Sequence, residues 1–189
     1  LGGCVINYAK VVSLIKENKM VSGVRAKDLE TGREYEIKGR SVINATGIFI
    51  DSIRKMDVPD CETIIAPSQG VHIVLDKSFL PGKSAIMVPH TEDGRVLFAV
   101  PWHDRVIIGT TDTPVDQPLL EPKPLPNEIA FLLSHAARYL TKDPKPEDIL
   151  SVFAGIRPLI RSDTSHETSS LSRDHHITCL LYTSPSPRD

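Results

Sequence analysis

Three kinds of side chain in this sequence could act together on a small anionic substrate. His72 lies in the apolar stretch GVHIVLD, and an imidazole can act as a general base near neutral pH because its ordinary pKa is about 6.5. Arg157, in GIRPL, and Arg173, in SRDHHI, carry planar cations that suit phosphate or carboxylate. The stretch GTTDTP, residues 109–114, ends an apolar run in small polar side chains.

Each candidate also has a purely structural explanation. His72 could be an exposed or structural histidine, and Arg157 could form a structural salt bridge. Arg173 could simply neighbour Asp174 or face solvent. From the residues alone, the sequence therefore indicates a mixed α/β enzyme fragment with an anion site, and these alternatives stay open.

The sequence gives no pattern typical of a metal site. The residues that could be imagined as ligands have neither HxH nor HExxH spacing, namely His90, His103, Asp104 and Asp112. The three cysteines are odd in number and far apart, which fits neither a disulfide framework nor a zinc site and favours a reducing compartment. We expect no metal.

Composition places the chain among soluble globular proteins and excludes some partners. Its 189 residues include 22 basic and 24 acidic ones, for a formal net charge of −2. The basic footprint of a nucleic-acid-binding protein is therefore missing, and we expect no nucleic-acid partner. No apolar run approaches the roughly 18 residues of a membrane helix. The chain begins at Leu1, so we expect a fragment.

Two groups of elements should position these side chains. Residues 3–47 alternate apolar and polar positions, which predicts an antiparallel meander. Residues 42–45 then predict a buried strand that ends at Gly47, with Asp51 as N-cap of a following helix. A strand, a turn of small residues and a helix start can present backbone N–H groups to a phosphate.

A second group of strands carries His72. Residues 63–109 predict an antiparallel sheet, residues 126–140 a helix with one apolar stripe, and the stretch ILSVFAGIRPLI another strand. Strict alternation puts His72 opposite Val71, Ile73 and Leu75, so it should point toward a pocket or solvent. Residues 178–189 lack an amphipathic pattern and are expected to be a disordered or non-native tail.

Four stretches in order, VINATGIFIDSIRKMD, IIAPSQGVHIVLD, DGRVLFAVPWHDRVIIGTTDTP and FAGIRPLI followed by SRDHHI, resemble the flavin-dependent glycerol-3-phosphate dehydrogenases of the mitochondrial and aerobic bacterial type. The resemblance covers about residues 3–177. It implies an α/β (α+β) fold like that of glycine oxidase and D-amino-acid oxidase, truncated at both ends. Residues 1–57 would be part of a Rossmann-type FAD-binding domain, 58–149 an antiparallel-sheet substrate domain, and 150–177 a return to the first domain.

The resemblance also implies an activity and roles for residues. Family members oxidise sn-glycerol 3-phosphate to dihydroxyacetone phosphate, pass a hydride to FAD and then electrons to quinone. They attach peripherally to the mitochondrial inner membrane or to the cytoplasmic side of the bacterial inner membrane. His72 and Arg157 would be catalytic residues, with His72 as the base. Thr111 would line the substrate pocket, and Arg157 and Arg173 would hold the phosphate near the flavin. The residues implied to contact FAD are Asn44, Ala45, Thr46, Gly47 and Gly155.

The sequence departs from the family pattern in three places. It contains no GxGxxG loop for the FAD pyrophosphate, its tail replaces a Gly-Gly-Lys-Trp-type segment, and Ile48–Phe49 replaces a Pro-aromatic pair. We therefore expect the isolated chain to bind FAD poorly and to turn over little. Two alternatives stay open: another FAD-dependent oxidoreductase of this fold that acts on amines or amino acids, and a non-catalytic relic or interaction module.

Overall fold

The computed structural model describes residues 2–89, 91, 95–161, 171 and 177. The chain divides into two compact units, with the boundary between residues 63 and 64. The sequence predicted a boundary after residue 57. Arg173 and the predicted tail, residues 178–189, lie outside the described residues.

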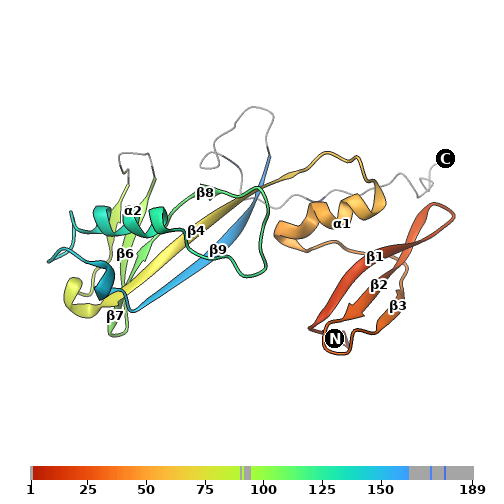
Figure 1. Ribbon diagram of the computed structural model, residues 1–189, viewed down its shortest axis with the longest axis horizontal. Helices are drawn as coiled ribbons and strands as arrows, with labels where there is room; N and C mark the ends of the chain where they lie inside the picture. Colours follow the sequence, from red (N-terminus) through yellow and green to blue (C-terminus); the bar gives the residue numbers. More distant parts are fainter. Residues whose placement is uncertain (1, 90, 92–94, 162–170, 172–176, 178–189) are drawn as a thin grey trace. The chain divides into compact units, whose positions relative to one another are not determined.

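The first unit begins with the predicted meander, which the structure confirms (Figure 1). Strands β1 (Ala9–Glu17), β2 (Met20–Asp28) and β3 (Glu34–Lys38) pair antiparallel in the order β1-β2-β3. Asn18 and Lys19 join the first two strands with φ of 52° and 66°, the conformation that a tight two-residue hairpin requires. The turns of this unit therefore follow from local sequence.

The buried strand predicted over residues 42–45 is wrong. These residues form no regular element, and Ile43 is 88% exposed. A strand is stabilised by pairing with a neighbour, and no strand in the described part of the chain pairs with this segment. A 3-10 turn, η1 (Gly47–Phe49), and helix α1 (Ile50–Asp57) follow. The N-cap is Phe49 rather than Asp51.

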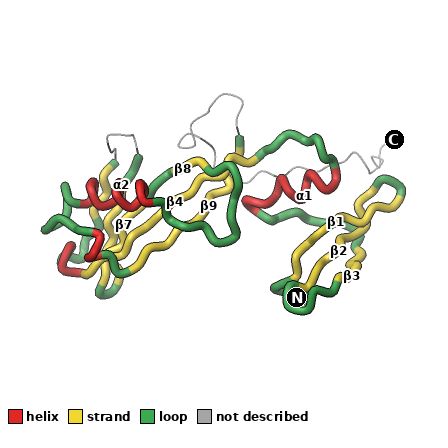
Figure 2. The backbone as a smooth tube through the Cα atoms, viewed as in Figure 1, coloured by secondary structure: helices red, strands yellow, loops and turns green. Residues whose placement is uncertain are grey.

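The second unit is an antiparallel sheet, as predicted (Figure 2). Its strands are β4 (Ile65–Asp76), β5 (Ile86–Val88), β6 (Leu97–Trp102), β7 (Arg105–Gly109), β8 (Thr113–Pro114) and β9 (Ser151–Ile160). They lie in the order β5-β6-β7-β4-β8, and β9 pairs with β4. Two 3-10 turns, η2 (Lys77–Phe79) and η3 (Pro146–Asp148), complete the unit.

Strand β9 changes one predicted domain assignment. Residues 150–177 were expected to return to the first domain, but β9 pairs with β4 along ten positions, from Ile160 opposite Ile65 to Ser151 opposite Val74. Figure 1 draws β4 and β9 as two long ribbons side by side. Residues 151–160 therefore belong to the sheet of the second unit. Most of residues 162–177 lie outside the described residues.

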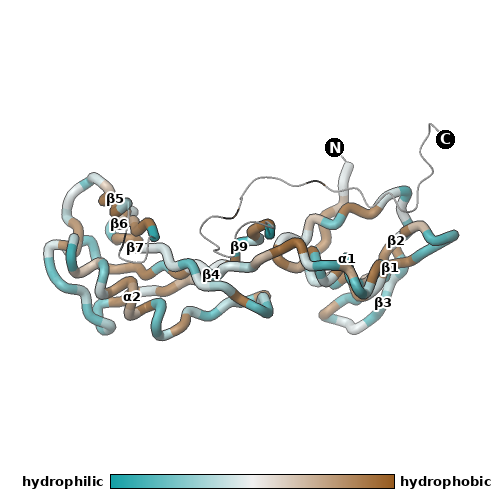
Figure 3. The backbone as a smooth tube through the Cα atoms, turned by 90° about the horizontal axis from the view of Figure 1, so that it is seen from above, coloured by the Kyte–Doolittle hydropathy of each residue, from teal (hydrophilic) through white to brown (hydrophobic). Residues whose placement is uncertain are grey.

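The core of the second unit lies on one side of β4. Helix α2 (Pro126–Ala136) packs on this side, where Leu132 and Ala136 meet the alternate residues Val71, Ile73 and Leu75. The helix ends at residue 136 and not at 140, because residues 137–140 continue in turns. We call this side the covered face of β4, and the other side, which carries Gly70 and His72, the open face. Figure 3 gives β6 and β7 the apolar colour that this core requires.

Replacing Ile73 by alanine should lower the free energy of unfolding by about 2–5 kcal/mol, since its side chain is 0% exposed and the change leaves a cavity. Urea unfolding can be followed through Trp102, the single tryptophan of the sequence, which lies in β6 of this unit. Met87→Ala is the control, because Met87 is 60% exposed. Equal losses for the two variants would contradict this placement of the core.

Candidate active site

The polar stretch after β7 sends successive side chains to opposite faces of the sheet. Thr110 Oγ1 accepts a hydrogen bond from Arg157, and Asp112 accepts one from Ser68 on the open face. Thr111 and Thr113 point to the covered face, where both hydroxyls donate to Glu128. The alternation of an extended chain therefore divides four small side chains between two sets of partners.

Arg157 is held at one end of the open face. Its Nη2 lies 2.9 Å from Thr110 Oγ1, its Nη1 lies 3.2 Å from the carbonyl oxygen of Thr111, and the same Nη1 lies 3.6 Å from Asp112 Oδ1. Arg157 therefore does form a salt bridge, with Asp112, which was the structural alternative for this residue. These partners fix the plane of the guanidinium. The guanidinium lies close to Gly70, because a Cβ built on Gly70 would be 2.7 Å from Arg157 Cζ.

Glu128, on α2, is the functional candidate that the sequence analysis missed. The residue is 3% exposed, and its carboxylate accepts hydrogen bonds from Thr111, Thr113, Gln69 and the backbone N–H of Leu125, at 2.7–2.9 Å. Burial raises the pKa of Glu128, but these four donors outweigh it and leave the pKa below its ordinary value. Glu128 therefore stays charged and fixes the GTTDTP stretch.

The placement of Thr111 corrects its predicted role. Its side chain is 0% exposed, and its hydroxyl accepts from the Val71 N–H at 2.9 Å while it donates to Glu128 Oε1 at 2.9 Å. A hydroxyl used in this way does not line the open face. Thr110 presents its hydroxyl there instead, and Thr111 contributes only its carbonyl oxygen to Arg157.

His72 lies on the open face, as the alternation predicted. Its ring stacks on Phe153, with centroids 4.9 Å apart and ring planes 6° apart. Partial burial lowers the pKa of His72 below its ordinary value, and the Arg157 cation lowers it further. The imidazole is therefore neutral at neutral pH and has a nitrogen that can accept a proton.

A hollow of about 270 Å³ lies on this face, over the paired strands β4 and β9. Its lining includes His72 and Phe153 at one end, Arg157 at the other, and Gly70 and Gly155 between them. Gly70 lies opposite Gly155 in the sheet, and a Cβ on Gly155 would meet nothing within 4 Å. The backbone at Gly155 is therefore open to a flat group.

The predicted cofactor-binding residues of the first unit form a local turn. Asn44 Oδ1 accepts from the Thr46 hydroxyl at 2.8 Å, and Asn44 Nδ2 donates to the Ile50 carbonyl oxygen at 3.0 Å. Gly47 has a φ of 57°, which favours glycine, while Ala45 is an exposed neighbour. The turn leads into α1, so Asn44 stabilises the start of that helix.

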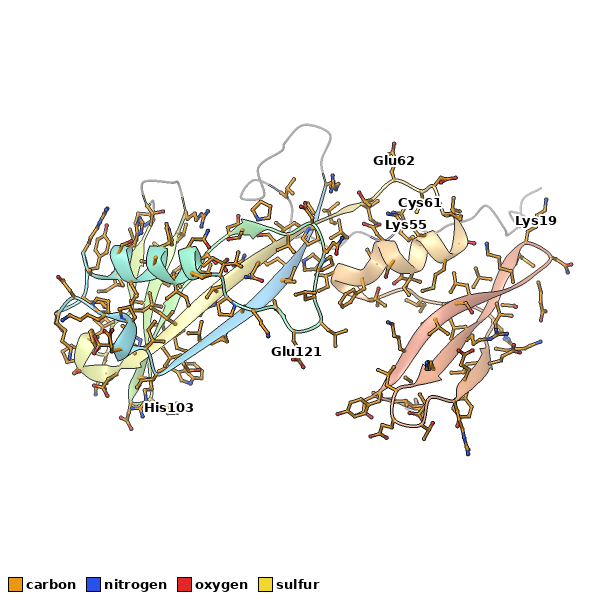
Figure 4. The ribbon with its side chains drawn as sticks, in the orientation of Figure 1. Lys19, Lys55, Cys61, Glu62, His103 and Glu121 are labelled. Atoms are coloured by element: carbon orange, nitrogen blue, oxygen red, sulfur yellow. The ribbon has the colours of Figure 1, made fainter. Side chains whose placement is uncertain are left out.

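Of the residues considered as metal ligands, His90 lies outside the described residues. His103 lies in the turn between β6 and β7 and points outward (Figure 4). In the described part of the chain, no three histidine, cysteine or acidic side chains form a cluster suited to a metal ion. Nor is any helix there long and apolar enough to cross a membrane.

Comparison with known proteins identifies the family. The profile of the DAO family, described as FAD dependent oxidoreductase, matches residues 1–180. The chain belongs to this family. A mitochondrial glycerol-3-phosphate dehydrogenase of Macaca fascicularis is 44% identical over 186 residues, which cover 93% of this chain and 25% of that protein. The chain thus spans about a quarter of the length of this relative.

Two solved structures share the fold of this chain. The glycerol-3-phosphate dehydrogenase of Bacillus halodurans, complexed with FAD, matches with a TM-score of 0.75 and 35% identity, over 82% of this chain and 32% of that one. The L-proline dehydrogenase of P. horikoshii matches with a TM-score of 0.52 and 17% identity, over 87% of this chain and 41% of that one. The second likeness concerns the fold alone.

The variant Glu128→Gln should lower the free energy of unfolding at pH 7 by about 1–3 kcal/mol, because an amide cannot accept from all four donors. The lowered pKa of Glu128 means that its contribution is present above its unfolded pKa and is lost as pH falls through its folded pKa. The stability of the variant should therefore depend less on pH in the acid range, and the two curves should converge there.

Urea unfolding at several pH values measures this difference through Trp102. Glu121→Gln is the matched control, because Glu121 is exposed and points outward in Figure 4. A constant gap between wild type and Glu128→Gln from pH 7 down to the acid range would show that the charge of Glu128 is not what stabilises the site.

Proposed function

We propose that this chain is part of an FAD-dependent glycerol-3-phosphate dehydrogenase, which oxidises sn-glycerol 3-phosphate to dihydroxyacetone phosphate. The observation that carries the proposal is the spacing of two groups on the open face. The Arg157 guanidinium lies beside Gly70, and His72 follows two residues later on the same face of β4. Two residues of a strand span about 7 Å. That separation suits a three-carbon phosphate ester with its anionic end at Arg157.

Arg157 is the group proposed to bind the phosphate. Its guanidinium is oriented by Thr110, Asp112 and the Thr111 carbonyl, so little conformational freedom remains to be lost on binding. A dianionic phosphate forms charge-assisted hydrogen bonds with such a cation. We assign Arg173 to the same phosphate on the family resemblance alone, since it lies outside the described residues.

His72 is proposed to remove the proton of the C2 hydroxyl. A base must be unprotonated before it can act, and the low pKa of His72 keeps the imidazole neutral at pH 7. The stack on Phe153 orients the ring. Oxidation of the alcohol then releases one proton to His72 and one hydride from C2.

FAD is the cofactor whose flavin ring we propose for the hollow. Gly155 leaves β9 without a side chain between Phe153 and Arg157, and a Cβ there would project into open space that a planar ring can occupy. When bound, FAD supplies the acceptor for the hydride. The turn of Asn44, Ala45, Thr46 and Gly47 is proposed as a further contact of the cofactor, on the family resemblance.

The onward partner and location are also proposals. Reduced enzyme would pass electrons to quinone, with peripheral attachment to the mitochondrial inner membrane, or to the cytoplasmic side of the inner membrane in a bacterium. The relative from Macaca fascicularis, named as mitochondrial, supports the mitochondrial location. The Arg157 cation and the polar His72 ring, which both line the hollow, support the choice of a small polar substrate.

A second candidate is oxidation of an amino acid by the same fold. The likeness to L-proline dehydrogenase shows that this architecture also occurs in an enzyme named for an amino acid. The guanidinium of Arg157 binds a carboxylate as readily as a phosphate. The two candidates therefore differ in substrate, and a substrate panel separates them.

Replacing Arg157 by lysine should raise KM for glycerol 3-phosphate roughly 10–100-fold, since a paired charge-assisted contact is worth about 1.5–3 kcal/mol. The assay uses the protein expressed from the complete open reading frame that encodes this chain. It follows the reduction of a quinone analogue, with glycerol 3-phosphate or L-proline as substrate. Arg105→Lys is the control, because Arg105 is an exposed residue of β7. Turnover of proline but not of glycerol 3-phosphate would replace the first proposal by the second.

Replacing Gly155 by valine should lower the FAD content of the same purified product by about tenfold or more, because the new side chain would occupy the space proposed for the ring. The ratio of flavin to protein absorbance measures the content. Gly82→Val is the control, since a Cβ on Gly82 has its nearest neighbour at 4.0 Å and the residue lies outside the hollow. Full FAD content in Gly155→Val would contradict the proposal that the flavin ring lies over Gly155.

A further inference from the structure

Three residues form a row across the sheet at the level of His72. His72 on β4 lies opposite Phe153 on β9 and opposite Gly109 on β7. Residues directly opposite one another on adjacent strands project to the same face. The row therefore gathers an imidazole, a phenyl ring and a residue without a side chain on the open face.

The His72 ring contacts both neighbours. On one side it lies parallel to the phenyl ring of Phe153, with 4.9 Å between centroids. On the other side it crosses the backbone of Gly109 so closely that a Cβ there would lie 2.6 Å from His72 Nε2 and 2.7 Å from Cγ. Only glycine leaves room for the imidazole in this position.

We propose that Phe153 and Gly109 are positioning residues that hold the His72 imidazole in one orientation, with Phe153 packing against its ring and Gly109 giving it space. The catalytic meaning of this arrangement rests on the proposed function, because it fixes the nitrogen of the proposed base relative to the substrate held by Arg157. The arrangement itself is a property of this chain. Neither residue takes part in proton or hydride transfer.

The charges around His72 distinguish this positioning from an electrostatic effect. Of the described residues on β4, β7 and β9, Arg157 is the charged group that acts on the pKa of His72, and Asp112 pairs with Arg157. Phe153 and Gly109 carry no charge. Substituting them therefore alters the packing of the ring and leaves the nearby charges in place.

Nuclear magnetic resonance of the 189-residue chain tests the geometry without cofactor or substrate. The imidazole signals of His72 are assigned by their loss in His72→Gln. In the wild type, we expect nuclear Overhauser effects between the His72 and Phe153 rings, and a His72 pKa below 6.5. Phe153→Leu should raise the pKa toward its ordinary value because the ring loses burial, whereas Phe153→Tyr should preserve it. Absence of the ring contacts in the wild type would overturn the proposal.

Gly109→Ala tests the other side of the row. The added methyl group should displace the imidazole, so the contacts with Phe153 should weaken. Gly82→Ala and Tyr35→Leu are the controls, because Gly82 has no close neighbour and Tyr35 is an exposed aromatic residue of the other unit. Unchanged ring contacts in a folded Gly109→Ala would overturn the role of Gly109. If that variant does not fold, Phe153→Leu and the wild-type contacts still decide the proposal.

Steady-state kinetics of the protein expressed from the complete open reading frame distinguish the positioning of His72 from its proposed role as the base. If His72 is the base, Phe153→Leu should lower kcat on the order of tenfold to a hundredfold and move the acid limb of its pH profile upward, with KM little changed. If His72 is not the base, the pKa of His72 should rise in the resonance experiment while kcat stays unchanged. That result would support the positioning roles of Phe153 and Gly109 and contradict the proposal that His72 removes the substrate proton. An unchanged His72 pKa in a folded Phe153→Leu variant would contradict the positioning role of Phe153.

Discussion

The buried carboxylate of Glu128 is the interaction on which the candidate site depends. Burying a charge is unfavourable unless hydrogen bonds replace its hydration, and here four donors from three segments do so. Two of the donors are the hydroxyls of Thr111 and Thr113, which fix the stretch between β7 and β8. The same stretch gives Arg157 its partners on the opposite face. A charge in the core thus sets the direction of a cation at the surface.

The sheet separates these two tasks. Its covered face holds apolar residues and the Glu128 hydrogen bonds, while its open face holds His72, Phe153, Arg157 and the bare backbone of Gly155. Antiparallel pairing of β4 with both β7 and β9 brings residues that are far apart in sequence to one level of the sheet. Stability and the proposed chemistry therefore come from opposite sides of the same strand.

Alternation along β4 was enough to place His72 opposite Val71 and Ile73, because strand periodicity is a local property. The same rule fails beyond Gly109, since Ile108 and Thr111 both lie on the covered face although they are three residues apart. The segment at residues 42–45 was mispredicted because pairing depends on a partner strand. A signal for Glu128 did exist: it lies four residues before Leu132 and eight before Ala136, on the apolar stripe of α2, where a carboxylate needs buried donors.

The division of the polar stretch between two faces also limits how this part of the chain can change in evolution. Single replacements such as threonine by serine keep each oxygen on its own side. Insertion or deletion of one residue between Thr110 and Thr113 would exchange the two sides, so that Glu128 and Arg157 would lose their partners together. We therefore expect a change in the length of this stretch to damage the site more than a conservative replacement of any one of its residues.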